Sequence, residues 1–118
     1  MKMYVKAIAD LNKAISILTS THQNAGYLYA RRARYKSDSK TYSEYSILKD
    51  YNISIGFDAT IQKGYAYQKR SWYYSSINKF SEAINDLDTA LMIDPKNSLY
   101  LTSRCNLKIV ILLLFWVI

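Results

Sequence analysis

Residues 64–97 read GYAYQKRSWYYSSINKFSEAINDLDTALMIDPKN, and this stretch contains patterns for two helices separated by a short turn. In its second half, apolar residues recur at offsets 0, 3, 4, 7, 10 and 11, which places them on one helical face. They are Phe80, Ala83, Ile84, Leu87, Ala90 and Leu91. Asp94 and Pro95 predict the end of this helix, since the residue before a proline disfavours helical backbone. We expect Asn78 to cap its start.

The same spacing recurs twice more along the chain, which indicates an internal repeat. The first copy has the same six offsets 76 residues earlier: Tyr4, Ala7, Ile8, Leu11, Ala14 and Ile15. The second copy matches the last five positions 36 residues earlier: Ile47, Leu48, Tyr51, Ser54 and Ile55. The segments that begin at Gly26, Gly64 and Ser98 also share an arginine followed by a small residue, at Arg32, Arg70 and Arg104. We expect these arginines to pack between adjacent units.

The unit at residues 64–97 resembles the tetratricopeptide repeat, a family of paired helices with a 34-residue period. Tyr67 stands at the family's tryptophan position, Ser71 at its glycine and Tyr74 at its tyrosine. The family's two alanines and its proline are matched by Ala83, Ala90 and Pro95, whereas Arg70 and Leu87 replace a leucine and an aromatic residue. The resemblance implies that seven residues pack the repeats together: Tyr67, Ser71, Tyr74, Ala83, Leu87, Ala90 and Pro95.

The fold implied by this resemblance is all-α, an α-solenoid of antiparallel helix pairs in a right-handed superhelix. We expect about two full units with partial units at both ends, all in one domain. Residues 1–25 would form the second helix of a partial repeat, residues 26–63 an irregular repeat and residues 64–97 a regular one. Residues 98–118 would be the first helix of a further repeat that runs into a hydrophobic tail.

The tail, residues 109–118, reads IVILLLFWVI and contains no polar residue. A membrane-spanning helix needs roughly 20 apolar residues, so this segment is too short to cross and we expect no membrane association. Three interpretations stay open. The tail is the end of a truncated or misread gene or a segment that caps the last groove, it is the start of a membrane anchor, or it is a regular repeat helix.

The composition fits a small folded protein without catalytic chemistry. A single cysteine, Cys105, cannot form an internal disulfide, and the N-terminal segment lacks the unbroken apolar core of a signal peptide, so we expect a cytoplasmic protein. His22 lies in a polar loop, and Cys105 occupies a small-residue packing position. The carboxylates of Asp86, Asp88 and Asp94 fit no calcium loop and are expected on the solvated helix surface. We therefore predict no enzymatic activity, no metal and no cofactor.

Stacked helix pairs of this kind present an extended concave surface, and the resemblance implies which residues line it. They are Tyr27, Arg31, Arg34, Tyr65, Lys69 and Trp72. Aromatic and arginine side chains often anchor partner peptides. A net charge of +7 favours an acidic partner. The leading hypothesis is a scaffold or adaptor that binds an acidic or amphipathic segment of another protein.

Two alternatives belong to other classes. A basic and aromatic helical array could bind RNA, although so few units would read too few bases for specificity. The chain could also be an inactive fragment of a longer array that self-associates through its open ends. Some members of the family grip a chaperone's C-terminal carboxylate, but the residues at those five positions do not match: Ala30, Arg34, Lys69, Leu99 and Ser103. We therefore predict no such clamp.

Overall fold

The computed structural model describes residues 2–18, 24–57 and 60–117, and all regular structure in these ranges is helical. This confirms the predicted all-α class. The elements are α1 (Lys2–Ile17), α2 (Asn24–Ser39), α3 (Glu44–Gly56), α4 (Thr60–Ser76), α5 (Phe80–Ile93) and α6 (Ser98–Val117).

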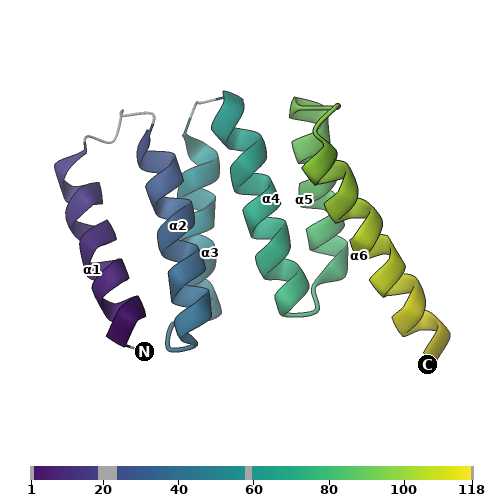
Figure 1. The fold of residues 1–118 in the computed structure, drawn as a ribbon, viewed down its shortest axis with the longest axis horizontal. Helices are drawn as coiled ribbons and strands as arrows, with labels where there is room; N and C mark the ends of the chain where they lie inside the picture. Colours follow the sequence, from purple (N-terminus) through teal and green to yellow (C-terminus); the bar gives the residue numbers. More distant parts are fainter. Residues whose placement is uncertain (1, 19–23, 58–59, 118) are drawn as a thin grey trace.

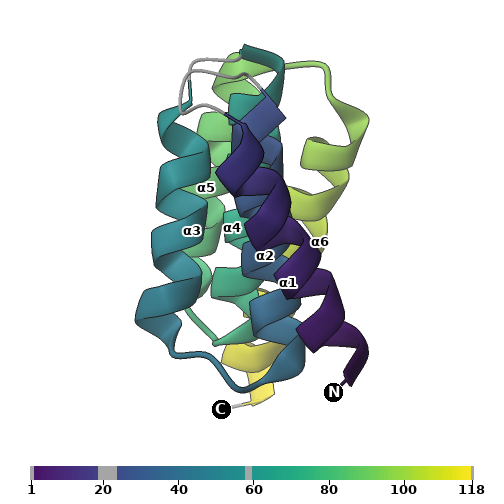
Figure 2. The same cartoon turned by 90° about the vertical axis from the view of Figure 1, so that its left-hand side faces the viewer.

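The helices follow one another across the molecule, and each runs in the direction opposite to the one before it (Figure 1). Each helix contacts the next along the chain, and α2 also contacts α4. Seen from the α1 side, α3 and α5 lie on one side of the molecule and α6 on the other, with α2 and α4 between them (Figure 2). The molecule is elongated, with principal extents of 48 × 32 × 20 Å.

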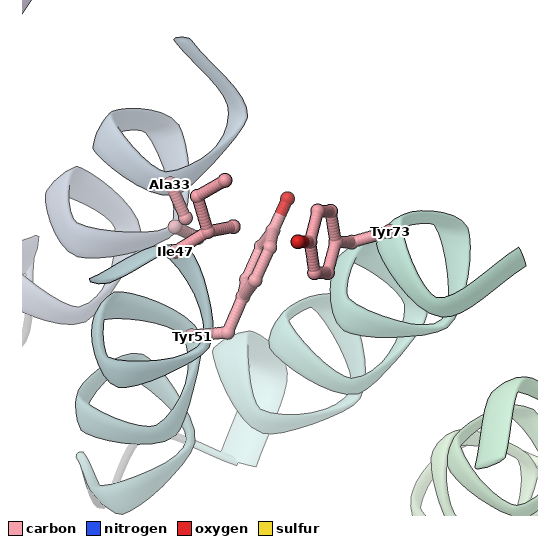
Figure 3. Packing of buried hydrophobic residues seen from close by; sticks show 5 residues of the cluster. Ala33, Ile47, Tyr51 and Tyr73 are labelled. Carbon is pink, nitrogen blue, oxygen red and sulfur yellow. The ribbon is translucent and has the colours of Figure 1, made fainter. Parts of the chain in front are cut away.

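The predicted apolar stripes form the core. Ile47 and Tyr51 of α3 pack with Ala30 and Ala33 of α2 and with Tyr73 of α4 (Figure 3). In a second cluster, Ala83 and Leu87 of α5 contact Leu107 of α6. A third cluster joins α5 to α6 and is flanked by Tyr67; its buried members are Ala90, Leu91 and Tyr100. The helices therefore pack through the spacing that the sequence repeats.

Helices α2 and α3 approach closely at Gly26. A Cβ at this position would lie 3.1 Å from the Phe57 Cβ and 3.3 Å from the Ser54 carbonyl oxygen. Ser54 Oγ donates a hydrogen bond of 2.6 Å to the Gly26 carbonyl oxygen. Glycine thus serves a close approach here rather than a turn, since any Cβ would push Phe57 or Ser54 away by a few tenths of an ångström.

The turn between α4 and α5 differs from the expectation for Asn78. Asn78 does not cap α5; Lys79 occupies the N-cap position and makes no side-chain capping hydrogen bond. Instead, Asn78 has φ 64° and terminates α4. The amides of Asn78 and Lys79 donate to the carbonyls of Ser75 and Tyr74. This is the pattern of a left-handed helix end, and asparagine tolerates that conformation better than most residues.

The other helix ends agree with the sequence patterns more closely. Helix α5 ends at Ile93, directly before Asp94 and Pro95. Helix α6 begins at Ser98, and Asn97 Oδ1 accepts a hydrogen bond from the Tyr100 amide, which caps it. Helix α4 begins at Thr60, four residues before the predicted unit, because nothing between Thr60 and Gly64 interrupts a helix.

Two of the three arginines that the sequence places at equivalent positions, Arg32 and Arg70, each link three consecutive helices. Arg32 of α2 donates to both carboxylate oxygens of Asp50 on α3, at 2.9 and 2.7 Å, and to Asn12 on α1. Arg70 of α4 repeats this geometry with Asp86 on α5, at 2.8 and 2.7 Å, and with Asn52 on α3. We refer to these two sets of contacts as the arginine bridges.

The arginine bridges overturn one expectation about the acidic residues. Asp86 was expected on the solvated surface, but it is 4% exposed because Arg70 holds its carboxylate between the helices. Asp88 and Asp94 are exposed, as expected. The hydrogen bonds with Asp50 raise the pKa of Arg32, and those with Asp86 do the same for Arg70 against the opposing effect of burial.

The hydrophobic tail continues α6 as one helix instead of forming a separate element. Leu107 and Ile111 pack against α5, whereas most apolar side chains beyond them are exposed. Residues 109–118 alone are too short to span a membrane, but in this continuous helix the segment Ser98–Trp116 has the length and composition of a candidate span. Cys105 is exposed, which contradicts the packing role expected for it, because no described helix covers that side of α6.

Candidate functional site

The six predicted groove residues lie together along α2 and α4, the two helices that contact each other directly. Tyr27 and Tyr65 occupy the same register on the two helices, and their ring centroids are 5.6 Å apart. Between the helices is a hollow of about 240 Å³ that is lined by Ala30, Arg31, Arg34, Tyr35, Asp38, Tyr65 and Lys69. We call it the α2/α4 hollow.

Arg31 is fixed by two tyrosines of its own helix. Its guanidinium donates to the hydroxyl of Tyr27 at 2.7 Å and to that of Tyr35 at 2.9 Å, one helical turn to either side. The guanidinium carbon also lies within 5.7 Å of both ring centroids. These hydrogen bonds raise the pKa of Arg31, with Tyr35 contributing most. Neither partner carries a formal charge, so Arg31 keeps its full charge available to a ligand.

Arg34 has a different environment, because it is paired with an acid. Its Nε lies 3.2 Å from Oδ2 of Asp38, four residues later on α2. Its guanidinium carbon lies 3.9 Å from the ring centroid of Trp72 on α4, a cation–π contact. Arg34 therefore ties Trp72 to the hollow, and Asp38 offsets its charge.

Lys69 completes the cationic lining from the α4 side. Its Nζ lies 5.2 Å from the ring centroid of Tyr65, and no described carboxylate forms an ion pair with it. Burial lowers the pKa of Lys69, and the positive charge of Arg34 lowers it further. Burial likewise raises the pKa of Tyr65. The environment disfavours the lysine charge, and a bound anion would reverse this effect.

Sequence reasoning missed three residues of the hollow: Ala30, Tyr35 and Asp38. Tyr35 lies four residues after Arg31, and Asp38 lies four residues after Arg34. Side chains at this spacing are neighbours on a helix, so the signal was present in the sequence. Tyr27 and Trp72, which were predicted, do not line the hollow itself but hold Arg31 and Arg34 at its edge.

A second hollow of about 250 Å³ lies between α4, α5 and α6, and Trp72 is part of its wall. Its other lining residues are neutral: Gln68, Ser71, Ser75, Leu87, Ser103, Asn106, Leu107 and Val110. Of the two hollows, only the α2/α4 hollow has charged residues in its lining, and Trp72 lies between them.

The described residues contain no cluster of three or more His, Cys, Asp or Glu side chains that could hold a metal ion. His22 lies outside the described residues. Of the seven residues expected to pack the repeats together, Ala83, Leu87 and Ala90 are fully buried or nearly so and Ser71 is buried, whereas Pro95 is exposed in the turn after α5. Tyr67 and Tyr74 are half-buried and flank the guanidinium of Arg70, with ring centroids 5.5 and 5.6 Å from its central carbon.

No protein-family model matches the chain, and a search of curated protein sequences gave no match either.

Proposed function

We propose that this chain is a tetratricopeptide-like α-solenoid that acts as a non-enzymatic interaction module. Its ligand is a segment of another protein that places an Asp or Glu side chain in the α2/α4 hollow. The consecutive antiparallel helices and the repeated arginine bridges support the solenoid arrangement.

The observation that carries the binding proposal is the charge balance of the hollow. Three cations, Arg31, Arg34 and Lys69, line it together with one carboxylate, that of Asp38. Because Asp38 pairs with Arg34, the charges of Arg31 and Lys69 face the cavity without a formal counter-charge among the described residues. A ligand carboxylate would supply it and accept charge-assisted hydrogen bonds.

The size of the hollow also favours a side chain over a small molecule. Drug-sized and cofactor ligands occupy pockets of roughly 300–1,000 Å³, and the α2/α4 hollow has about 240 Å³. The adjacent Trp72 is 36% exposed and Tyr27 is 37% exposed, so both offer aromatic surface beside the cations. An acidic residue followed by an aromatic or aliphatic residue would use both features.

The test uses fluorescein-labelled peptides in which two glutamates flank a phenylalanine, with glutamine versions as controls. We expect the variant with Arg31→Gln and Lys69→Gln to bind the glutamate peptide at least about 100-fold more weakly, since it loses two charge-assisted hydrogen bonds of about 1.5–3 kcal/mol each. The matched control is Lys40→Gln with Lys49→Gln, which removes two exposed charges elsewhere. Fluorescence anisotropy measures both.

Equal affinity for the glutamate and glutamine peptides, or an equal loss in the control variant, would refute the proposal. The same apparatus tests the RNA alternative with labelled poly-uridine. Binding to RNA should weaken steeply with salt, since it depends on released counterions. RNA binding that is stronger than peptide binding and is lost with Arg31 and Lys69 would assign the hollow to nucleic acid.

A further inference from the structure

Helices α3 and α5 each carry an equivalent buried face, whose central aspartate binds an arginine of the preceding helix. On α3 this face consists of Ile47, Asp50 and Ser54, which are 4%, 2% and 4% exposed. On α5 the residues at the same offsets are Ala83, Asp86 and Ala90, which are 0%, 4% and 0% exposed. In both cases an arginine of the preceding helix binds the central aspartate.

Helix α1 carries the same face, but it is open. The residues at these offsets are Ala7, Asp10 and Ala14. Asp10 is exposed and the two alanines are only half-buried. Helix α2 covers a different part of α1, where Ile8 and Leu11 are buried. No other described helix contacts α1 to an appreciable extent.

Helix α6 presents the complementary surface. Arg104 follows the register of Arg32 and Arg70, and its Nη1 donates to Asp88, which stands where Asn12 and Asn52 stand in the arginine bridges. In those bridges, Nε and Nη2 bind the aspartate of the following helix. The described part of the chain offers Arg104 no such second aspartate.

Lys108 adds a second charge at the same place. It occupies the register of Lys36, whose Nζ lies 3.0 Å from Oδ2 of Asp50 and so joins Arg32 in holding that carboxylate. Lys108 is exposed. Two further residues on this side of α6, Leu101 and Cys105, are also exposed, whereas Ala33 and Ser71, in the register of Cys105, are buried.

We propose that two copies of this chain associate head to tail, with α1 of one copy packed on α6 of the other as α3 packs on α2 and α5 on α4. Asp10 of one copy accepts from Arg104 and Lys108 of the next, and Ala7 packs beside Cys105. The two surfaces differ, so a pair of copies still has one free α1 surface and one free α6 surface. Such a heterologous contact builds open chains of molecules rather than closed two-fold dimers. The contact is separate from the α2/α4 hollow and does not depend on the proposed peptide binding.

Charge reversal in the full chain tests the proposal. Sedimentation equilibrium of the wild type should show a mass that rises with concentration beyond that of a dimer. Asp10→Arg, or Arg104→Glu with Lys108→Glu, should each weaken association at least about 30-fold, since opposed like charges cost several kcal/mol at an interface. The chain with all three changes should recover to within about threefold of the wild type.

Matched controls place the same charge changes elsewhere. Glu82→Arg is the control for Asp10→Arg, and Lys49→Glu with Lys96→Glu is the control for the α6 pair; all three residues are exposed. Both controls should associate like the wild type. Circular dichroism verifies that each variant keeps its helix content.

A disulfide test needs no charge change and uses the native Cys105. In Figure 3, Ala33 of α2 lies beside Ile47 of α3, and these residues correspond to Cys105 and Ala7. Ala7→Cys should therefore give a ladder of covalent oligomers with oxidised glutathione on a non-reducing gel. Ala9→Cys, at an exposed position two residues further along, should give no ladder beyond dimers. Adding Cys105→Ser to Ala7→Cys should abolish the ladder.

Three results would overturn the proposal. One is a wild-type chain that stays monomeric at all accessible concentrations. Another is association that neither charge reversal weakens, as contact between apolar tails would give. The third is binding of the chain to phospholipid vesicles that removes all association between copies and is unaffected by Asp10→Arg. This result would assign the α6 surface to a membrane.

Discussion

The hydroxyl group of Tyr51 gives the sharpest test of the packing. Tyr51 of α3 is completely buried, and its ring centroid lies 6.1 Å from that of Tyr73 (Figure 3). Its hydroxyl oxygen has no hydrogen-bond partner among the described residues. Burial accordingly raises the pKa of Tyr51.

We expect Tyr51→Phe to stabilise the fold. An unsatisfied buried polar group costs about 1–3 kcal/mol, and deleting the oxygen leaves a cavity smaller than a methyl group, which offsets part of the gain. The net expectation is an increase of about 1 kcal/mol in the free energy of unfolding. For a domain of this size, this corresponds to about 4 °C in melting temperature. Tyr51→Ala, in contrast, should cost about 3–5 kcal/mol, because it removes a whole buried ring.

The assay is urea denaturation followed by far-ultraviolet circular dichroism. Tyr73→Phe is the matched control, since the Tyr73 hydroxyl is not among the buried atoms that lack a partner, and it should change stability by less than about 0.5 kcal/mol. A Tyr51→Phe variant that is less stable than the wild type would refute the reasoning, because the hydroxyl would then have to make a favourable hydrogen bond.

The raised pKa of Tyr51 also predicts how the stability of the fold depends on pH. A folded-state pKa above the unfolded value of about 10 means that the unfolded chain releases the proton first, so stability is complete below pH 10 and falls as pH rises further. Tyr51→Phe should make this alkaline loss shallower. It should not abolish the loss, since burial also raises the pKa values of Tyr65, Tyr73 and Tyr100.

Two further predictions concern polar groups at helix contacts and ends. Asp86→Asn should destabilise the fold by about 3 kcal/mol, because it leaves the half-buried Arg70 without its anion. Asp88 pairs with Arg104 at the surface, so Asp88→Asn should cost only about 0–1 kcal/mol in the same denaturation experiment. Equal effects of the two changes would contradict the role given to burial. Lys40→Gly should stabilise the fold by about 0.5–1 kcal/mol, since Lys40 has φ 59° at the end of α2 and its side chain is exposed. A lower melting temperature would show that the lysine side chain stabilises the fold by more than the backbone strain costs.

The apolar spacing in the sequence predicted the helices well because burial of one face is what forms them. The stripes that begin at Tyr4, Ile47 and Phe80 all lie within single helices, and Asp94 and Pro95 mark the end of α5 as predicted. Apolar periodicity depends only on neighbours along the helix. It can therefore be recognised without knowing what packs against that face.

Features that depend on a partner from another helix could not be predicted in this way. Asp86 looks like any surface aspartate until Arg70 is known to lie opposite it. The exposure of Cys105 depends on which helices cover α6. Asn78 could either cap α5 or end α4 in a left-handed conformation, and only the structure of the turn distinguishes these roles. For the α2/α4 hollow, the resemblance supplied four of the seven lining residues, Arg31, Arg34, Tyr65 and Lys69. The pairing of Arg34 with Asp38, which sets the charge balance, follows instead from the spacing of these two residues along α2.

The arginine bridges make α3 more important than α1 for the resistance of the molecule to unfolding. This helix supplies Asp50 to one guanidinium and Asn52 to the other, whereas α1 supplies a single acceptor, Asn12. Fraying of α1 therefore breaks one polar link, but melting α3 leaves two half-buried cations short of acceptors at the same moment. Amide protons in α3 should exchange with solvent only when the whole array of helices unfolds. Those in α1 should exchange faster, through local fraying of this terminal helix.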